Sequence, residues 1–449
     1  GAMRRRGAAK EESFGKTDSE SMLCTTEDSA ADDEPKPPPT TSVHEKKLGW
    51  YGKVRKAAWR SLFGTIMMSL FGFIIYLGHA YVCIMVFTIQ CCLFKELVGV
   101  RKKLSNERRI PLFRSIQWAW FFVAAFFTWS DGIYAYVREN PMRANKWSSG
   151  LRNFFLEKSK FISFSLYSGL FMVSILTLRK GLYKYQFTQY SWTLTSCCII
   201  VFQMRAAFQM IYSGLFWFLL PCSLVICNDI MAYFSGVTLG GKLIRRPFLE
   251  LSPNKTWEGF FGAAVWTLIF AFWFSRYLSD KTWAVCTPED ISFVVRPLSC
   301  TPAPMYKLHS LKAFAEDSLP DSLWQVCLLV SHYAPRLASV GSWEVRPSQI
   351  HALALGAFAS VVAPFGGFLA SAIKRAYGIK DFNNVIPGHG GMMDRFDCQF
   401  IMCMCTYVHH FTFCRQTPFS VEAILAAVSM LRVEERREVI ARLNKQFGE

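Results

Sequence analysis

Apolar residues gather in long blocks between residues 61 and 415, and short polar segments separate these blocks. A helix of about 20 mostly apolar residues is long enough to cross the hydrocarbon core of a bilayer. The pattern therefore predicts an all-α polytopic integral membrane protein with about nine transmembrane helices. Gln203 and Arg205 interrupt the apolar pattern of the fifth and sixth spans. The predicted spans are residues 61–78, 79–98, 115–134, 160–178, 188–206, 208–227, 259–277, 350–370 and 398–415.

The two ends of the chain differ from this apolar middle part. Residues 1–45 combine many acids with Ser, Thr and Pro, so we predict a disordered acidic cytosolic tail there. Residues 46–415 form the predicted transmembrane domain, which includes a long polar segment at 278–349. Residues 416–449 are predicted to be a C-terminal helical tail, because the charges from Val433 to Phe447 follow a helical pattern.

The charge of the chain narrows the class of protein further. It carries 50 Lys and Arg against 33 Asp and Glu, a net charge of +17, although 52% of its residues are hydrophobic. A soluble nucleic-acid-binding protein has a polar basic surface, so we expect no nucleic-acid partner. In a membrane protein the cations instead lie in the loops that join the spans.

The distribution of Lys and Arg predicts the orientation in the membrane. Segments 46–60 and 101–114 are strongly basic, which is typical of cytosolic loops. Counting crossings from them places 228–258 and 371–397 on the same cytosolic face. The same count places the segment 278–349 in the lumen.

Most of the 15 Cys residues lie inside apolar blocks, where Cys behaves as a small hydrophobic residue. Cys286 and Cys300 lie instead in the polar segment 278–349. They could form a disulfide if this segment faces an oxidising lumen.

Two carboxylates precede the last apolar block. Asp394 and Asp397 are three residues apart, a spacing that puts both side chains on one face of a helix. Mg²⁺ takes oxygen ligands together with substrate phosphates, so such a pair suits a magnesium site at the membrane surface. Capping of a helix N-terminus by acids explains the pair about equally well.

A Gly-rich loop, Gly388-His389-Gly390-Gly391, lies just before this pair. Its backbone N–H groups could bind a phosphate, although an ordinary tight turn explains the loop as well. His389 has the chemistry of a general base, a phosphate donor or a packing residue. The nearby cations suit either phosphate binding or anchoring to anionic lipid. These cations are Lys374, Arg375, Lys380 and Arg395.

A second polar segment follows the sixth predicted span. Asn228 and Asp229 end that span, and acids at membrane depth are costly and mark functional sites by default. Ser252, which a proline follows, suits a purely structural helix cap. Lys255 and Glu258 are three residues apart and could pair with each other.

The segment 371–397 resembles the signature of the eukaryotic-type CDP-diacylglycerol synthases, the phosphatidate cytidylyltransferases. That signature reads S-x-x-K-R-x4-K-D and then P-G-H-G-G-x-x-D-R-x-D, and every fixed position is present here. Residues 228–236 and 252–259 resemble the upstream blocks of the family, and 364–367 resembles its eukaryotic branch. The resemblance covers roughly residues 46–415.

One position departs from the bacterial form of this pattern. Bacterial members carry an acid four residues before the signature serine, Ser371, and Gly367 occupies that place here. A third carboxylate for a metal would then come from Asp381 or Asp229.

The resemblance implies an enzyme that transfers the CMP moiety of CTP to phosphatidic acid, giving CDP-diacylglycerol and pyrophosphate for phospholipid biosynthesis. It implies Mg²⁺ as cofactor, a cytidylyltransferase domain at 46–415 and a signature loop at 371–397. The implied metal ligands are Asp394, Asp397 and Asp229. The implied catalytic residues are Asp394, Asp397, Lys374, Arg375, Lys380, Asp381, His389 and Arg395. The implied substrate-binding residues are Ser371, Gly388, Gly390, Gly391, Asn228, Asp229, Tyr233, Ser252, Lys255, Thr256 and Glu258.

Two other functions compete with this interpretation. A CTP-dependent polyprenol or dolichol kinase would transfer the γ-phosphoryl group of CTP to a lipid alcohol. A non-enzymatic membrane transporter would place polar residues along a path through several spans, whereas here they cluster at one face. We expect a multi-pass protein of the endoplasmic reticulum membrane, with CTP, phosphatidic acid and membrane lipids as partners and the active site facing the cytosol. The sequence leaves the oligomeric state open and is compatible with a homodimer.

Overall fold

The structure is a computed structural model of the 449-residue chain. The predicted acidic tail, residues 1–45, lies outside the residues that it describes. The described residues are 50–101, 110, 112–139, 150, 153–242, 244, 249, 255–288, 293–295, 297–310, 344–383, 390–414, 421, 424–425, 428, 431 and 433–447.

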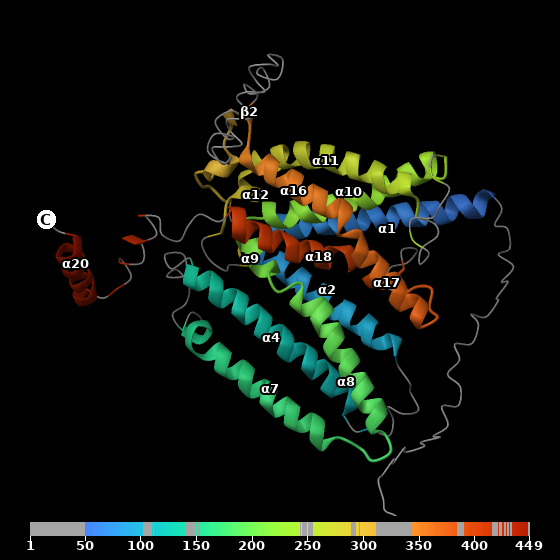
Figure 1. Cartoon of the computed structure of the whole chain (residues 1–449), viewed down its shortest axis with the longest axis horizontal. Helices are drawn as coiled ribbons and strands as arrows, with labels where there is room; N and C mark the ends of the chain where they lie inside the picture. The colour runs from blue at the N-terminus through green and yellow to red at the C-terminus, as the bar shows by residue number, and fades with distance from the viewer. Residues whose placement is uncertain are drawn as a thin grey trace, which may run out of the picture. The chain divides into compact units, whose positions relative to one another are not determined.

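Helices make up nearly all of this described part, which agrees with the predicted all-α class (Figure 1). The α-helices are α1 (Trp50–Leu77), α2 (His79–Val100), α4 (Phe113–Glu139), α7 (Ser159–Leu176), α8 (Tyr183–Cys197), α9 (Ala207–Tyr212), α10 (Phe216–Leu239), α11 (Trp257–Ser279), α12 (Thr282–Val285), α16 (Pro347–Val361), α17 (Pro364–Ala376), α18 (Met393–His409) and α20 (Val433–Phe447). Wider π-helical turns occupy Phe154–Lys158, Cys198–Phe202 and His410–Cys414. A short 3₁₀ turn, η3, covers Pro304–Tyr306, and β1 (His309–Ser310) pairs antiparallel with β2 (Glu344–Val345).

Six helical segments of the described chain are long and apolar enough to cross a membrane. The remaining three predicted spans also lie on helices, within α1, α4 and α18 with the π-turn after it. The apolar part of α1, Ser61–Leu77, is shorter than the six. The six segments are His79–Val100, Ser159–Leu176, Tyr183–Tyr212, Phe216–Leu239, Trp257–Ser279 and Pro347–Ala376.

The boundaries of the predicted sixth span, 208–227, are wrong. The helix α10 begins at Phe216 and continues to Leu239, so Asn228 and Asp229 lie within it and do not end it. The chain turns before α10 at Gly214, whose φ of 125° is a conformation that L side chains rarely adopt. Hydrophobicity alone does not register such a backbone turn between two apolar runs.

Of the two polar residues that interrupt the fifth and sixth predicted spans, Arg205 has a structural explanation. Arg205 forms an ion pair with Asp131 of α4. The helical path is also irregular here, with the π-turn Cys198–Phe202 followed by turns before α9. An ionisable side chain inside a membrane protein is tolerated when it has such a partner.

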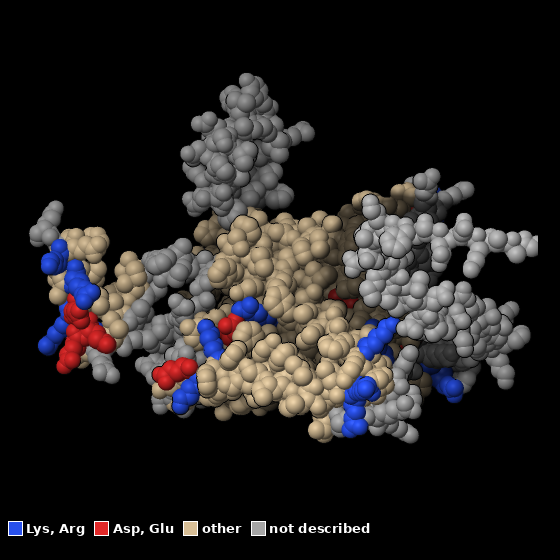
Figure 2. Space-filling model, turned by 60° about the horizontal axis from the view of Figure 1, so that its bottom comes forward, with Lys and Arg blue, Asp and Glu red and all other residues tan. Residues whose placement is uncertain are grey.

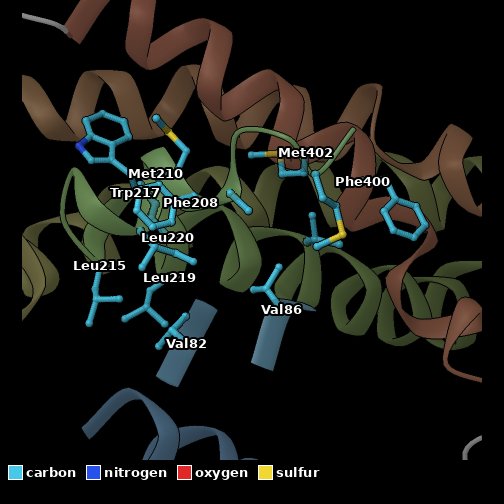
Figure 3. Close-up of a cluster of buried hydrophobic side chains, with 14 of the residues drawn as sticks. Val82, Val86, Phe208, Met210, Leu215, Trp217, Leu219, Leu220, Phe400 and Met402 are labelled. Atoms are coloured by element: carbon cyan, nitrogen blue, oxygen red, sulfur yellow. The ribbon is translucent and has the colours of Figure 1, made fainter. Parts of the chain in front are cut away.

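The core lies where α2, α9, α10 and α18 meet (Figure 3). Val86 of α2, Trp217 and Leu220 of α10 and Met402 of α18 are all almost fully buried there. The helix α10 also packs against α11 and α16, and α18 packs against α17. These contacts hold α10, α17 and α18 together, and the polar segments attached to these three helices are the ones that carry the candidate site.

The surface of the described part fits a lipid environment. Large apolar side chains are exposed along α1, α7 and α11, as expected for helix faces that contact lipid. Uncharged residues cover the middle of the face in Figure 2, and Lys and Arg lie toward its two ends. Cys286 and Cys300, whose pairing the sequence leaves open, form a disulfide after α11.

Candidate active site

The signature segment, residues 371–397, begins inside α17 and ends inside α18. Ser371, Lys374 and Arg375 are therefore helical, and only the middle of the predicted loop connects the two helices. The helices approach closely at Gly366, where an added Cβ atom would overlap the backbone of Asp397. This glycine therefore lets α17 carry its cations to the N-terminal end of α18.

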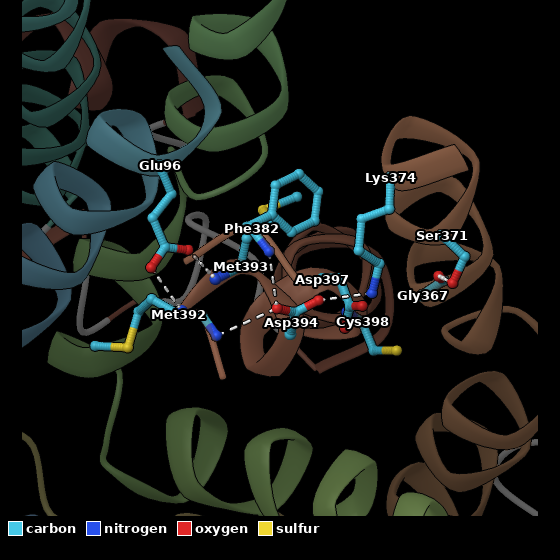
Figure 4. A network of polar contacts seen from close by, with 11 residues as sticks. Glu96, Gly367, Ser371, Lys374, Phe382, Met392, Met393, Asp394, Asp397 and Cys398 are labelled. Atoms are coloured by element: carbon cyan, nitrogen blue, oxygen red, sulfur yellow. Dashed lines mark hydrogen bonds and ion pairs between the residues drawn. The ribbon is translucent and has the colours of Figure 1, made fainter. Parts of the chain in front are cut away.

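Asp394 is the centre of the polar network in Figure 4. Its Oδ1 atom accepts a hydrogen bond from Lys374 Nζ at 2.6 Å, and both side chains are largely buried. Its Oδ2 atom accepts backbone N–H groups from Gly391 at 3.2 Å and from Phe382 at 3.4 Å. The carboxylate is thus held in one orientation by a cation and by two amides of the connecting loop.

The two described glycines of the Gly-rich loop lie against this carboxylate. Gly390 has a φ of 82°, and an added Cβ atom there would lie 3.6 Å from Asp394 Oδ2 and 3.9 Å from Asp381 Oδ1. At Gly391, an added Cβ atom would come within 3.0 Å of the same Asp394 oxygen. The loop therefore needs small residues at both positions, and it brings Asp381 near Asp394.

Glu96 of α2 joins the network from a distant part of the chain. Its two carboxylate oxygens accept the backbone N–H groups of Met392 at 2.9 Å and Met393 at 2.8 Å. Its side chain is buried, and Met393 is the first residue of α18. A carboxylate that binds free amides at a helix N-terminus is favoured by the helix dipole. Glu96 therefore fixes the start of the helix that carries Asp394 and Asp397.

Asp397 lies one turn further along α18 and faces a second group of charges. Its Oδ1 atom accepts the N–H of Cys398 at 2.8 Å. Burial raises the pKa of the Asp397 carboxyl to about 6, the Cys398 amide works against this rise, and the negative charge of Asp229 adds to it. Like charges held near one another disfavour ionisation unless a cation joins them.

The described parts of the segments 228–258 and 371–397 meet, and the topology predicted that both segments lie on the same face. Asp229 of α10 lies close enough to Asp397, Lys255 and Arg395 to interact with each of them electrostatically. The Lys255 ammonium lies 4.5 Å from the ring centroid of Phe368 on α17. Asp229 and Lys255 therefore complete a site with Asp397 although more than 130 residues separate them in sequence.

Several other predicted site residues have contacts that explain them structurally. The Ser371 hydroxyl donates to the Gly367 carbonyl one turn earlier. Thr256 caps α11 by accepting the Gly259 N–H, and Glu258 Oε1 accepts the Ile244 N–H at 2.7 Å. Asn228 is buried and accepts a hydrogen bond from Thr267, and Tyr233 is exposed beside Phe234.

The remaining predicted residues divide into exposed ones and ones outside the described part. Arg375, Lys380, Asp381 and Arg395 are exposed at the same end of α17 and α18. Gly388, His389 and Ser252 lie outside the described residues.

The carboxylates fit the chemistry of a magnesium ion that is shared with a substrate. Mg²⁺ usually binds one or two carboxylates, several waters and substrate phosphates, and it does not need an all-protein cage. Asp394 and Asp397 provide two carboxylates on one helix face, and Asp229 adds a third beside Asp397. In the described ranges these acids do not bring three ligand atoms to within 4.8 Å of one another.

Comparison with known proteins places the chain in a family. The pattern that defines the Cytidylyltransferase family matches residues 58–413, which is most of the chain. The chain belongs to this family. The match contains both polar segments and all the helices that join them, so the carboxylate network described above lies wholly inside the family's domain.

Curated relatives match this chain over most of its length. A probable phosphatidate cytidylyltransferase of Dictyostelium discoideum is 38% identical over 404 residues, which cover 88% of this chain and 78% of the relative. Phosphatidate cytidylyltransferase 1 of Arabidopsis thaliana is 37% identical over 384 residues, 85% of each chain. The Saccharomyces cerevisiae phosphatidate cytidylyltransferase is 34% identical over 372 residues, covering 83% of this chain and 76% of the yeast protein.

Glu96 is the residue of the network that sequence reasoning missed. It lies inside the predicted span 79–98, and an acid within an apolar span was the one available signal. The position of Gly367, where bacterial members carry an acid, is also informative. An added Cβ atom there would lie 3.4 Å from Asp397 Oδ2, so this position directly borders the carboxylate.

Proposed function

We propose that this member of the family is a phosphatidate cytidylyltransferase. It transfers the CMP moiety of CTP to phosphatidic acid and releases pyrophosphate. The observation that carries the proposal is the convergence of Asp394, Asp397 and Asp229 with Lys374 and Lys255, because all five lie in the segments that resemble the family signature.

The chemistry is a nucleotidyl transfer between two anionic substrates. An oxygen of the phosphatidate phosphate attacks the α-phosphorus of CTP and forms a new P–O bond. The bond from the α-phosphorus to the bridging oxygen breaks, and pyrophosphate leaves with that electron pair. The attacking oxygen is already ionised near neutral pH, so the reaction needs positioning and charge neutralisation more than a strong base.

The cations of the site supply this neutralisation. Lys374 is held 2.6 Å from Asp394 and can exchange part of this ion pair for a phosphate oxygen when substrate binds. Arg375, Lys380 and Arg395 are exposed at the same end of the helices, where they can contact the triphosphate or the lipid phosphate. Lys255, which lies near Asp229, contributes from the other segment.

Asp394, Asp397 and Asp229 would hold Mg²⁺, which when bound neutralises charge on the CTP phosphates. The carboxylates of Asp394 and Asp397 are already oriented by backbone amides and, for Asp394, by Lys374. Such fixed ligands need little reorganisation when a metal–nucleotide complex enters.

The position of Asp229 suits a lipid substrate. Its helix, α10, is one of the segments long and apolar enough to cross a membrane. A phosphatidate molecule can therefore keep its acyl chains in the bilayer while its phosphate reaches the carboxylates. We also propose that the site faces the cytosol of the endoplasmic reticulum membrane, which the basic segments 46–60 and 101–114 support. A homodimer stays a prediction.

The decisive experiment follows the α- and γ-phosphates of CTP separately. Detergent-purified protein is incubated with phosphatidic acid, Mg²⁺ and CTP that is labelled at either the α- or the γ-phosphate. We expect the α-label in the lipid product and the γ-label in pyrophosphate, with no turnover when Mg²⁺ is chelated. A γ-label in lipid would instead identify a CTP-dependent lipid kinase and overturn the proposal.

A matched pair of variants connects this activity to the site. Asp397→Asn should abolish transfer of the α-label while the protein elutes from gel filtration as the wild type does. Glu438→Gln on α20 removes an exposed carboxylate outside the network and should leave turnover unchanged. Equal activity of the two variants would argue against the assignment of Asp397.

A further inference from the structure

A second cluster of metal-binding side chains lies at the opposite end of α18. His351, His409 and Cys414 bring one ligand atom each to within 4.8 Å of one another. Among the described residues, this is the group of three or more His, Cys, Asp or Glu side chains whose ligand atoms lie this close together. Asp394 lies in the first turn of α18, and His409 is its last residue. They are 15 residues apart, and a rise of 1.5 Å per residue puts them about 22 Å apart along the helix. The cluster is therefore distinct from the carboxylate site.

The backbone is shaped to bring these side chains together. In an α-helix, residues five apart point in directions that differ by roughly 140°. The chain from His410 to Cys414 is a π-helical turn, in which hydrogen bonds join residues five apart, so Cys414 comes back onto the face of His409. His351 reaches the same point from the first turns of α16.

The distance between the imidazoles already suits a shared metal ion. His351 Nδ1 and His409 Nε2 are 3.1 Å apart. Two nitrogens bound at about 2.0–2.1 Å to one tetrahedral metal are separated by roughly 3.3 Å. A small outward shift of the rings would thus replace their mutual hydrogen bond with two metal bonds.

We propose that His351, His409 and Cys414 form a Zn²⁺ site in this protein. Two imidazole nitrogens and one thiolate suit Zn²⁺ and are poor ligands for Mg²⁺, which prefers oxygen. Three protein ligands leave a fourth position for water or another ligand. His409 also lines an apolar cavity of about 680 Å³ together with Phe413.

The proposed ion would connect the start of α16 with the end of α18. The helix α16 packs against η3, and the 3₁₀ turn lies shortly after the disulfide residue Cys300. Tyr306 of η3 is close enough to Cys414 to interact with it electrostatically. A Zn²⁺ ion here would connect α16 to the π-turn that follows α18. It would therefore contribute to stability and not to phosphate chemistry.

The test uses the full-length protein without a polyhistidine tag, in detergent, with ZnCl₂ or CoCl₂ as the only added metal. We expect about one Zn²⁺ per chain after gel filtration, and a cobalt–thiolate charge-transfer band in the Co²⁺ form. Cys414→Ser should remove the band, and His351→Gln should weaken Zn²⁺ binding at least about tenfold. Cys405→Ser, which removes a thiol within α18 that is not one of the three proposed ligands, is the matched control and should behave as the wild type does.

A measurement on the wild type removes any dependence on whether these variants fold. Cysteines are alkylated with and without ZnCl₂, and the modified peptides are mapped by mass spectrometry. Protection of Cys414 but not of Cys405 supports the site. Equal labelling of Cys414 in both conditions, or absence of the cobalt–thiolate band, overturns it. Neither readout depends on cytidylyltransferase activity.

Discussion

The two ends of α18 offer opposite ligand chemistry. Its first turns present Asp394 and Asp397, hard oxygen donors that cations and backbone amides surround. Its last residue, His409, joins His351 and Cys414 in a cluster of nitrogen and sulfur donors. Hard oxygen donors select Mg²⁺, whereas imidazole and thiolate select softer ions. In our two proposals, therefore, one helix serves catalysis at one end and stability at the other, and this division can be tested.

The largest effect should come from removing a carboxylate at the first end. Asp394→Asn loses a charge that pairs with Lys374 and, in our proposal, binds Mg²⁺ on the CTP phosphates. We expect CMP transfer to fall by at least about 100-fold, the scale for losing one preorganised charge-stabilising group. Turnover with saturating CTP and Mg²⁺ measures this. Cys414→Ser provides the comparison, because it should change turnover less than about twofold if the two ends are independent.

A smaller loss is expected for the cation that holds this carboxylate. Lys374→Ala should lower kcat/KM for CTP about 10–100-fold, as for other residues that orient metal-binding groups. Lys374→Arg should recover part of that loss, since arginine keeps the charge but not the compact ammonium. Equal kinetics of the Ala and Arg variants would show that the charge of Lys374 does not matter to the site.

The pH dependence of magnesium activation tests Asp397. Burial raises the pKa of its carboxyl to about 6, so the group is ionised above that pH and protonated below it. Protons compete with a metal for the ionised form. The Mg²⁺ concentration for half-maximal activity should therefore be constant above pH 7 and rise about tenfold per pH unit below pH 6. A flat profile down to pH 5 would separate Asp397 from metal binding.

Glu96 is expected to have a moderate effect that acts through stability. Glu96→Gln keeps the shape of the side chain but loses the charge and one of the two oxygens that accept Met392 and Met393 amides. Leaving a buried donor unpaired costs about 1–3 kcal/mol. We expect a lower Tm and a several-fold fall in kcat, with little change in KM for CTP. An unchanged Tm would contradict its role at the start of α18.

The contrast between the ends of α18 also explains what sequence reasoning could reach. One short segment holds Asp394, Asp397 and the cations, and the two acids have helical spacing. Their proximity could therefore be predicted from the sequence. Counting membrane crossings predicts only that Asp229 lies on the same face as these residues, and its helix continues further than hydrophobicity indicates. The role of Glu96 could not be predicted, because it depends on the contact between α2 and the start of α18, and no local sequence pattern encodes such long-range packing. The His–Cys cluster depends on a π-turn, which has no sequence signature here.

The smallest effect on catalysis is expected from the disulfide between Cys286 and Cys300. Its two cysteines are 14 positions apart in the sequence, and for a loop of this size chain entropy predicts about 3 kcal/mol of stabilisation. Cys300→Ser, or reduction of the wild type, should lower the Tm. CMP transfer at a temperature where both proteins stay folded should change less than about twofold, because neither cysteine contacts the carboxylates. A large loss of transfer under those conditions would show that the polar segment after α11 is coupled to Asp394 through α16 and α18. The two ends of α18 would then function as one unit, and the division of catalysis from stability would have to be abandoned.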